Sequence, residues 1–186
     1  MSKEEALQIL DEWVKSPNLK KHMLAVAACM SFYAKKFGQD REKWWITGLL
    51  HDMDYEKFPN PIRDESRHPY KAVEFLKGKL DDESLDAILG HAAFTHVSRE
   101  SQMAKTLFAV DELTGMIVAV ALVKPEKKIS AVDIESVKKR FKEKRFAAGV
   151  NREEIIQGAQ ELGVSLDEHI QNVIDAMKEI ASELGL

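Results

Sequence analysis

The sequence is poor in cysteine, and it lacks the features that mark fibrous, low-complexity or membrane-spanning proteins. It has one cysteine, Cys29, so no disulfide can form within the chain. Nine glycines and five prolines among 186 residues exclude collagen-like and low-complexity architectures. The longest unbroken apolar run, residues 116–123, is far shorter than the roughly 20 residues that cross a bilayer. We therefore expect no membrane span.

An excess of positive charge is also missing. The chain has 27 Lys and Arg residues against 31 Asp and Glu residues, a formal net charge of -4. Bulk binding to phosphate backbones requires a basic excess, so we do not expect nucleic acid as the main partner. The first five residues are not followed by the apolar segment of a signal peptide. Together with the single cysteine, this predicts a reducing, cytoplasmic location.

What the sequence does contain is the composition of an ordinary globular domain. Hydrophobic residues make up 45% of the chain and charged residues 31%. A chain of this length can bury a sizeable core without disulfides or structural metals. We predict a single domain over residues 1–186.

Apolar residues recur at helical spacing along nearly the whole chain, which predicts an all-α bundle. Ser2 with Glu5 is a capping box for a helix ending at Lys15, and Asn18 can cap a second helix that ends at Gly38. Pro59 and Pro61 predict a loop over residues 55–67. We expect further helices over residues 41–52, 68–77, 82–94, 101–123 and 131–148, and two more capped by Asn151 with Glu154 and by Ser165 with Glu168.

The composition changes after Lys124-Pro125-Glu126, where a charged helix is expected. We therefore divide the chain into a core over about residues 18–125 and a C-terminal helical appendage over residues 126–186. Within the appendage, the basic stretch 138–145 follows an apolar stripe of Ile134, Val137 and Phe141. This pattern is typical of a solvated face, with a phosphate-facing flank or a nucleic-acid contact as alternatives.

Several ionisable residues lie within the most apolar predicted helices. His91 follows the apolar segment 87–90, and Asp111 follows the apolar segment 107–110. An unpaired buried imidazole costs about 1–3 kcal/mol, and a lone buried carboxylate costs more. One such histidine is by itself more typical of ordinary core packing, but several on different helices are explained if they share a partner. A transition metal ion is such a partner, because imidazole and carboxylate are its ligands.

Three glycines lie near these residues in the sequence: Gly48, Gly90 and Gly115. Each costs roughly 1 kcal/mol of helix propensity relative to alanine. That cost is reasonable where helices approach closely around a site, although ordinary packing of small residues is an alternative.

Five segments between residues 18 and 123 give the sequence a resemblance to a known family: KKHMLAVA, GLLHDMDY, RHPYKA, ILGHAAF and FAVDELTG, in that order. With them the chain resembles the HD-domain superfamily, which is named after its His-Asp doublet. The resemblance implies an HD-domain helical bundle in which His22, His51, Asp52 and Asp111 bind one metal ion. His68 and His91 match the additional histidines of the dinuclear subgroup, in which the doublet aspartate bridges two ions.

This resemblance implies a metal-dependent phosphohydrolase. In length and pattern the chain is similar to bacterial predicted HD-superfamily hydrolases, and more distantly to dinuclear enzymes that cleave dinucleoside polyphosphates. The expected reaction is cleavage of a phosphate ester or anhydride of a small nucleotide by a metal-activated hydroxide. One or two divalent transition metal ions are expected, and histidine-rich ligation favours iron, manganese, cobalt or nickel over magnesium.

The chain departs from the dinuclear pattern after the doublet. Many dinuclear members continue as His-Asp-x-Gly-Lys, whereas Asp52 is followed here by Met-Asp-Tyr-Glu-Lys, which displaces the lysine. Two other activities therefore remain as alternatives. One is an HD-type oxygenase with a mixed-valent iron pair, and the other is a non-catalytic sensor module that binds metal and nucleotide.

Residues around the predicted ligands are candidates for further roles. We assign catalysis to Asp52 and Asp54; Asp54 and Glu56 could orient a water or hold a ligand imidazole, or be solvated acids. For substrate binding the candidates are Lys57, Arg63, Arg67 and His96. His96 lies five residues after His91, off the same helical face, so we exclude it as a metal ligand. His169 is expected to be a packing residue.

Overall fold

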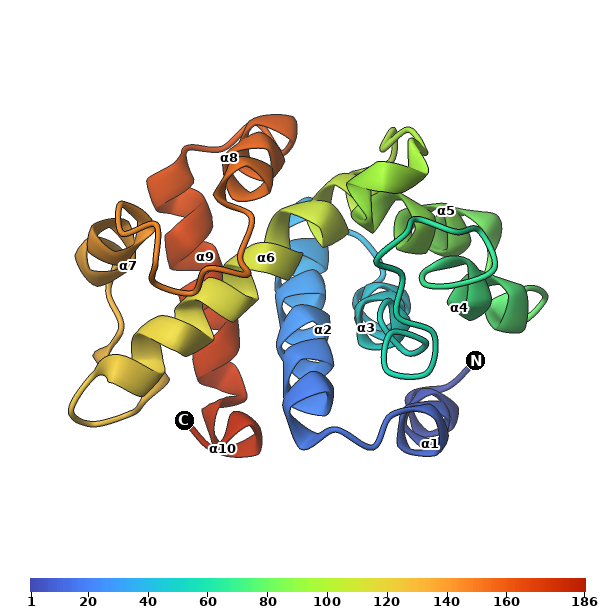
Figure 1. The fold of residues 1–186 in the computed structure, drawn as a ribbon, viewed down its shortest axis with the longest axis horizontal. Helices are drawn as coiled ribbons and strands as arrows, with labels where there is room; N and C mark the ends of the chain where they lie inside the picture. Colours follow the sequence, from blue (N-terminus) through green and yellow to red (C-terminus); the bar gives the residue numbers. More distant parts are fainter.

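The protein is built from helices joined by loops, without a β-sheet. The computed structural model describes residues 1–186. The all-α prediction is confirmed (Figure 1). In chain order the helices are α1 (Lys3–Trp13), α2 (Pro17–Phe37), α3 (Arg41–Leu50), α4 (Tyr70–Leu76), α5 (Asp82–His91), η1 (Ala93–Thr95), α6 (Gln102–Val123), η2 (Ile129–Ala131), α7 (Ile134–Phe141), α8 (Arg152–Glu161), α9 (Leu166–Glu179) and α10 (Ala181–Leu184).

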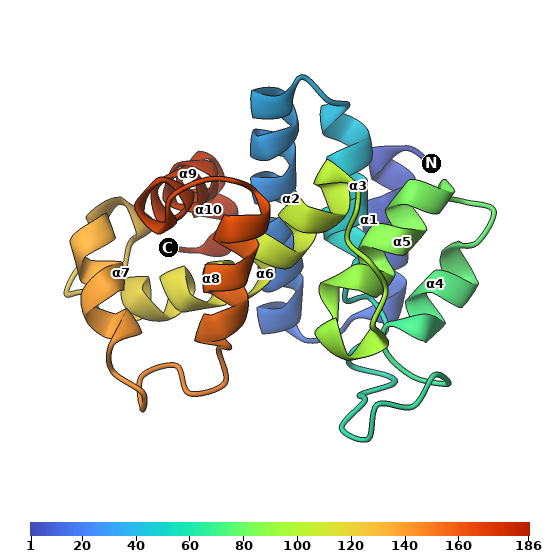
Figure 2. The ribbon, with the colours of Figure 1, turned by 90° about the horizontal axis from the view of Figure 1, so that it is seen from above.

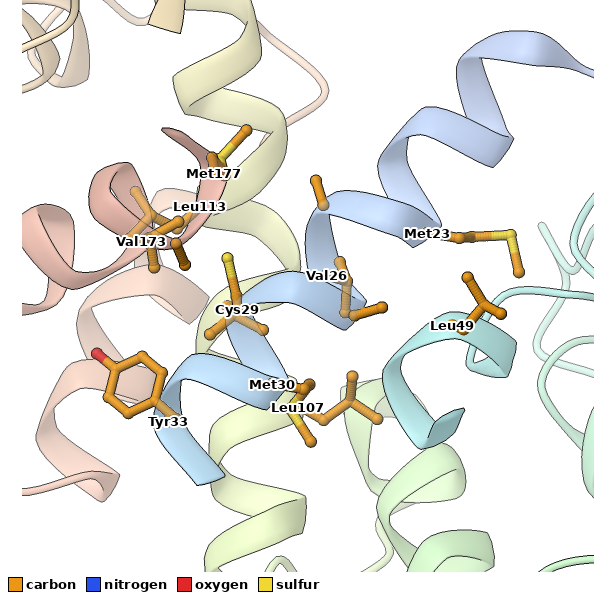
Figure 3. Packing of buried hydrophobic residues seen from close by; sticks show 14 of the residues in the cluster. Met23, Val26, Cys29, Met30, Tyr33, Leu49, Leu107, Leu113, Val173 and Met177 are labelled. Carbon is orange, nitrogen blue, oxygen red and sulfur yellow. The ribbon is translucent and has the colours of Figure 1, made fainter. Parts of the chain in front are cut away.

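Two long helices, α2 and α6, cross at the centre of the molecule, and each contributes many residues to the core. On one side of them lie α1, α3, α4 and α5, and on the other lie α7, α8, α9 and α10 (Figures 1 and 2). Figure 3 shows Met23 of α2 beside Leu49 of α3, while Tyr33 and Cys29 lie toward the opposite group of helices. One hydrophobic cluster of 40 buried residues joins both groups. Helices from the predicted core and from the predicted appendage therefore share a single core.

The close approach of α2 and α3 depends on the absence of a side chain at Gly48. A Cβ atom there would lie 3.0 Å from the Cα atom of Ala27 and 2.8 Å from Cγ of Met30. These separations are too short for a methyl group, so Gly48 allows α3 to lie against the alanine-rich face of α2. The contact brings the end of α3, and with it the His-Asp doublet, beside His22.

Helix α6 is the central apolar helix of the bundle. By length and composition alone it could cross a membrane, but 61% of its most apolar window is buried inside the molecule. It contacts α2, α5, α8 and α9, so neighbouring helices cover it on several sides. An apolar helix covered in this way is the pattern of a buried core helix.

The predicted start of the second helix was wrong by two residues. Ser16, rather than Asn18, caps α2 by accepting a hydrogen bond from the backbone N–H of Leu19, and Pro17 occupies the first turn. Proline suits this position because the first N–H groups of a helix have no partner within it. The preceding helix also ends earlier than predicted, at Trp13.

The predicted helix over residues 131–148 was too long, because α7 ends at Phe141. Residues 142–150 instead form a series of turns around the guanidinium group of Arg152. Arg152 donates hydrogen bonds to five carbonyl oxygens, those of Phe141, Glu143, Phe146, Ala147 and Val150. These bonds replace the intrahelical bonds that a continued helix would make.

Candidate metal centre

Six predicted ligands from different parts of the chain come together beside the crossing of α2 and α6. His22 lies on α2, and His51 and Asp52 directly follow α3. His68 lies in the loop before α4, His91 is the last residue of α5, and Asp111 lies in the middle of α6. The ends of α3 and α5, the loop before α4, an early turn of α2 and the middle of α6 therefore meet at one point.

The ring orientation of each histidine is fixed by a hydrogen bond at Nδ1. His51 and His91 bond to the carbonyl oxygens of Gly48 and Ile88, one turn earlier on their own helices. Because a carbonyl oxygen can only accept, Nδ1 must carry the proton in both rings. In its neutral form each ring therefore presents the lone pair of Nε2 to the site.

The other two histidines are held in the same way. Nδ1 of His68 lies 2.7 Å from a carboxylate oxygen of Asp54, which can only accept. Nδ1 of His22 lies 3.3 Å from the Thr114 hydroxyl, whose own proton goes to the carbonyl of Asp111. The hydroxyl oxygen is thus the acceptor for His22, and all four rings direct an Nε2 lone pair inward.

These four Nε2 atoms face the carboxylates of Asp52 and Asp111. Asp111 Oδ1 lies 3.0 Å from His22 and 3.5 Å from His51. Asp52 Oδ2 lies 3.7 Å from His22 and 3.6 Å from His51, while Asp52 Oδ1 lies 3.5 Å from His68 and 3.4 Å from His91. The two oxygens of Asp52 therefore face two different pairs of imidazoles.

Lone pairs and carboxylate oxygens at these distances repel one another unless a cation lies among them. Nε2 of His51 is completely buried and has no hydrogen-bond partner. Such an unpaired buried nitrogen is costly unless it binds a cation. A divalent ion fits this position, since ligand atoms about 2.0–2.2 Å from one ion lie roughly 3.0–3.7 Å from each other.

The close approach of the histidines and the two carboxylates also shifts the pKa values of the site. Burial alone would lower the pKa of His51, but the carboxylates of Asp52 and Asp111 outweigh burial and raise it to about 9. Burial would raise the pKa of both aspartates, yet the surrounding histidines bring it below the usual range of a carboxyl group. The site therefore attracts positive charge strongly, whether as protons or as metal ions.

A cavity of about 640 Å³ opens directly onto this cluster. Five of the six predicted ligands line it, and His51 lies fully buried behind them. The loop before α4 forms one wall with Tyr55, Pro59 and Arg63, and Phe94 lies near Arg63. The opposite wall comes from α6 and α8. A small molecule can thus reach the donors through this cavity.

The remaining predicted site residues lie at different distances from the cavity. Arg63 lines it, whereas Lys57, Arg67 and His96 are not among its lining residues. Lys57 lies over the ring of Trp13, and Arg67 donates to the carbonyl of Pro59. His96 is exposed, in a left-handed backbone conformation with a φ of 58°.

Asp54 and Glu56 hold parts of the structure in place. Asp54 is fully buried and accepts hydrogen bonds from Nδ1 of His68 and from the backbone N–H of Ala72. Its contact is with the ligand histidine, one of the two roles that the sequence left open. Glu56 accepts hydrogen bonds from the backbone N–H groups of Lys15 and Ser16 at the start of α2.

Sequence analysis missed two glutamates of the cavity wall, Glu112 and Glu154. Glu112 follows Asp111 directly, which could have marked it as a candidate. Glu154 was assigned to a capping box, but its side chain accepts from the Asn151 side chain, while the Asn151 backbone N–H donates to Glu112. Burial, and then the charge of Asp111, raises the pKa of Glu112 to about 7, and the same causes raise the pKa of Glu154.

Comparison with known families agrees with this geometry. The family model of the HD domain matches residues 19–161. The chain therefore belongs to the HD domain family, an all-α family of metal-dependent hydrolases. Searches of the curated proteins and of the solved structures found no match. The matched region extends beyond residue 125 and includes α8, which supplies Glu154 to the cavity.

Proposed function

We propose that the protein is a dinuclear metal-dependent phosphohydrolase that cleaves a phosphate ester or anhydride of a small nucleotide. His22, His51, Asp52 and Asp111 would hold one divalent ion, and His68 and His91 would hold a second with Asp52 shared between them. Iron, manganese, cobalt and nickel suit this histidine-rich donor set better than magnesium, which prefers oxygen ligands. We retain a cytoplasmic location as part of this proposal.

The arrangement of Asp52 is the observation that carries the proposal. Its two oxygens face separate histidine pairs at 3.4–3.7 Å, as a carboxylate bridging two ions would. A mononuclear site would leave the Nε2 atoms of His68 and His91 beside one oxygen of Asp52 with no ion between them. Two divalent ions in such a site would lower the pKa of a bound water toward 7 and would stabilise the charge of a transferring phosphoryl group.

The protein's own residues prepare this chemistry by positioning and by charge. Asp54 fixes the ring of His68 and keeps its proton on Nδ1, so that Nε2 is left free to bind a metal ion. Arg63 supplies the cavity's one lysine or arginine side chain, suited to a phosphate oxygen. Tyr55 and Phe94 offer aromatic rings on the same wall, against which a nucleobase can stack.

Phosphate release from a panel of nucleotides by protein loaded with manganese or iron tests the proposal. We expect turnover that is abolished by His51→Ala and that continues without oxygen. Loss of turnover under anaerobic conditions would identify the oxygenase instead. Tight nucleotide binding without any product, in both metal forms, would contradict the hydrolase and identify the sensor.

A further inference from the structure

Helix α8 reaches the metal centre from the far end of the chain, and its position is held by three contacts. Gly158 lies against Ala109 so closely that a Cβ atom would be 2.5 Å from the Ala109 Cα atom. Glu161 forms two hydrogen bonds with Arg99, which also donates to the carbonyl of Gly90. The backbone N–H before α8, that of Asn151, donates to Glu112.

These contacts determine where Glu154 lies. Glu154 and Gly158 are four residues apart and therefore share one face of α8. Because Gly158 packs on α6 at Ala109, the preceding turn of the same face lies over the next part of α6, where Asp111 and Glu112 are. Glu154 is accordingly a lining residue of the cavity, at intermediate exposure.

A ligand in the cavity would therefore contact the metal ions at one end and the carboxylates of Glu112 and Glu154 along one wall. The unpartnered Nε2 of His51, which is completely buried, marks the cation site independently of the glutamates. Two divalent ions would favour the ionised form of the lining carboxylates. The four of them, Asp52, Asp111, Glu112 and Glu154, would then balance the charge of the ions, so that Arg63 supplies the remaining positive charge. The negative charge of a single phosphate group already exceeds the positive charge of Arg63, and a second phosphate group would lie against the carboxylates of Glu112 and Glu154.

We propose that Glu154 is a specificity-determining residue that selects phosphomonoesters whose organic part carries hydrogen-bond donors, such as hydroxyl groups. Its carboxylate accepts a hydrogen bond from the donor, and its charge disfavours substrates with a second phosphate. This inference rests on the proposed hydrolase function and narrows its substrate class to monoesters. A nucleoside monophosphate, with its ribose hydroxyls, belongs to this class, and a nucleoside polyphosphate does not.

Three esters with the same carbon chain test the inference: propyl phosphate, glycerol phosphate and propanediol bisphosphate. For the manganese-loaded full chain we expect kcat/KM to be highest for glycerol phosphate. Glu154→Ala should lower kcat/KM for glycerol phosphate about tenfold, the effect of losing one hydrogen bond to a charged group. It should not lower kcat/KM for propyl phosphate, which has no hydroxyl group to bond to Glu154, and Glu154→Gln should raise kcat/KM for the bisphosphate by about tenfold.

The control is Glu153→Gln, which removes an exposed carboxylate from the same turn of α8 without touching the cavity. Calorimetric titration of the same proteins with propylphosphonate and dihydroxypropylphosphonate adds a measurement that requires no turnover. Tighter binding of the dihydroxy compound, lost in Glu154→Ala and kept in Glu153→Gln, supports the inference even if none of the esters is hydrolysed, an outcome that would refute only the hydrolase proposal. The inference would be overturned if the wild type and Glu154→Ala preferred the dihydroxy compound over propylphosphonate to the same degree, or if neither phosphonate bound.

Discussion

At the scale of single residues, the tautomer of each histidine decides what the site can bind. In the four histidines of the site, Nδ1 is used by a carbonyl, a carboxylate or a hydroxyl oxygen, so each neutral ring presents a lone pair at Nε2. Four such lone pairs around two carboxylates have no favourable arrangement without a cation. The doublet stands at the end of α3 because there its side chains can reach between α2 and α6 while the Gly48 carbonyl still holds the His51 ring.

The sequence predicted a shared metal ion, because buried ionisable residues on several apolar helices need a common partner, while the particular set of ligands was implied by the family resemblance. The Nδ1 partners could not be predicted, apart from Asp54. The carbonyls of Gly48 and Ile88 leave no signal in the sequence, and Thr114 meets His22 only because α6 packs on α2. Glu154 was missed for a different reason. Its spacing from Asn151 is that of a capping box, and only the docking of α8 on α6 brings its carboxylate to the cavity.

Asp54→Asn tests the support of the second ion. The amide can replace one of the two hydrogen bonds, to His68 or to Ala72, but its NH2 group opposes the other donor. We expect metal affinity at the second site to fall by about 10- to 100-fold, as measured by competition with a chelator. Asp86→Asn, an exposed change on α5, should leave both affinities unchanged. Wild-type affinity in Asp54→Asn would refute the positioning role.

At the scale of helices, caps and apolar spacing were good predictors, and tertiary contacts explain the errors. The predicted helices over residues 41–52 and 101–123 closely match α3 and α6. The helix predicted over residues 131–148 ends early because Arg152, which lies beyond it, donates to five carbonyl oxygens between residues 141 and 150 and so stabilises turns there. A propensity argument considers neighbours along the chain and misses such a distant donor.

Gly158→Ala tests whether α8 must lie directly against α6. A methyl group at Gly158 would overlap the backbone of Ala109, so α8 must move away. We expect a loss of about 1–3 kcal/mol in the free energy of unfolding, measured with urea, although alanine has the higher helix propensity. Gly149→Ala, where a methyl group meets nothing within 4 Å, is the matched control. If Gly158→Ala is as stable as Gly149→Ala, the close contact is not required.

At the scale of the whole molecule, a buried hydrogen-bond network joins the C-terminal helices to the two central ones. His169 of α9 accepts a hydrogen bond from the Tyr33 hydroxyl at Nδ1 and donates from Nε2 to the carbonyl of Ala109. Asn172 donates to the same hydroxyl. Burial lowers the pKa of His169 to about 4, so the ring is neutral in the folded protein near pH 7. The expected packing role of His169 thus includes a defined protonation state.

This protonation state predicts how stability depends on pH. In the unfolded chain His169 takes up a proton near pH 6.5, whereas the folded protein resists it until about pH 4. Its contribution to stability is therefore complete above pH 6.5 and is lost as the pH falls to about 4, a change of up to about 3 kcal/mol. Urea unfolding of the metal-free wild type and His169→Gln should show a difference in the free energy of unfolding that becomes smaller as the pH falls from 6.5 to about 4. A difference in the free energy of unfolding that does not change with pH would contradict the buried neutral ring.

The metal content of the protein tests the central claim most directly. Elemental analysis of protein loaded with manganese or iron and freed of excess metal should give two ions per chain. His68→Ala should reduce the content by about half, because it removes a ligand of the second ion only, and Asp52→Ala should remove nearly all of it. Equal loss in both variants would indicate a single ion. Wild-type protein that retains no metal at all would contradict the account.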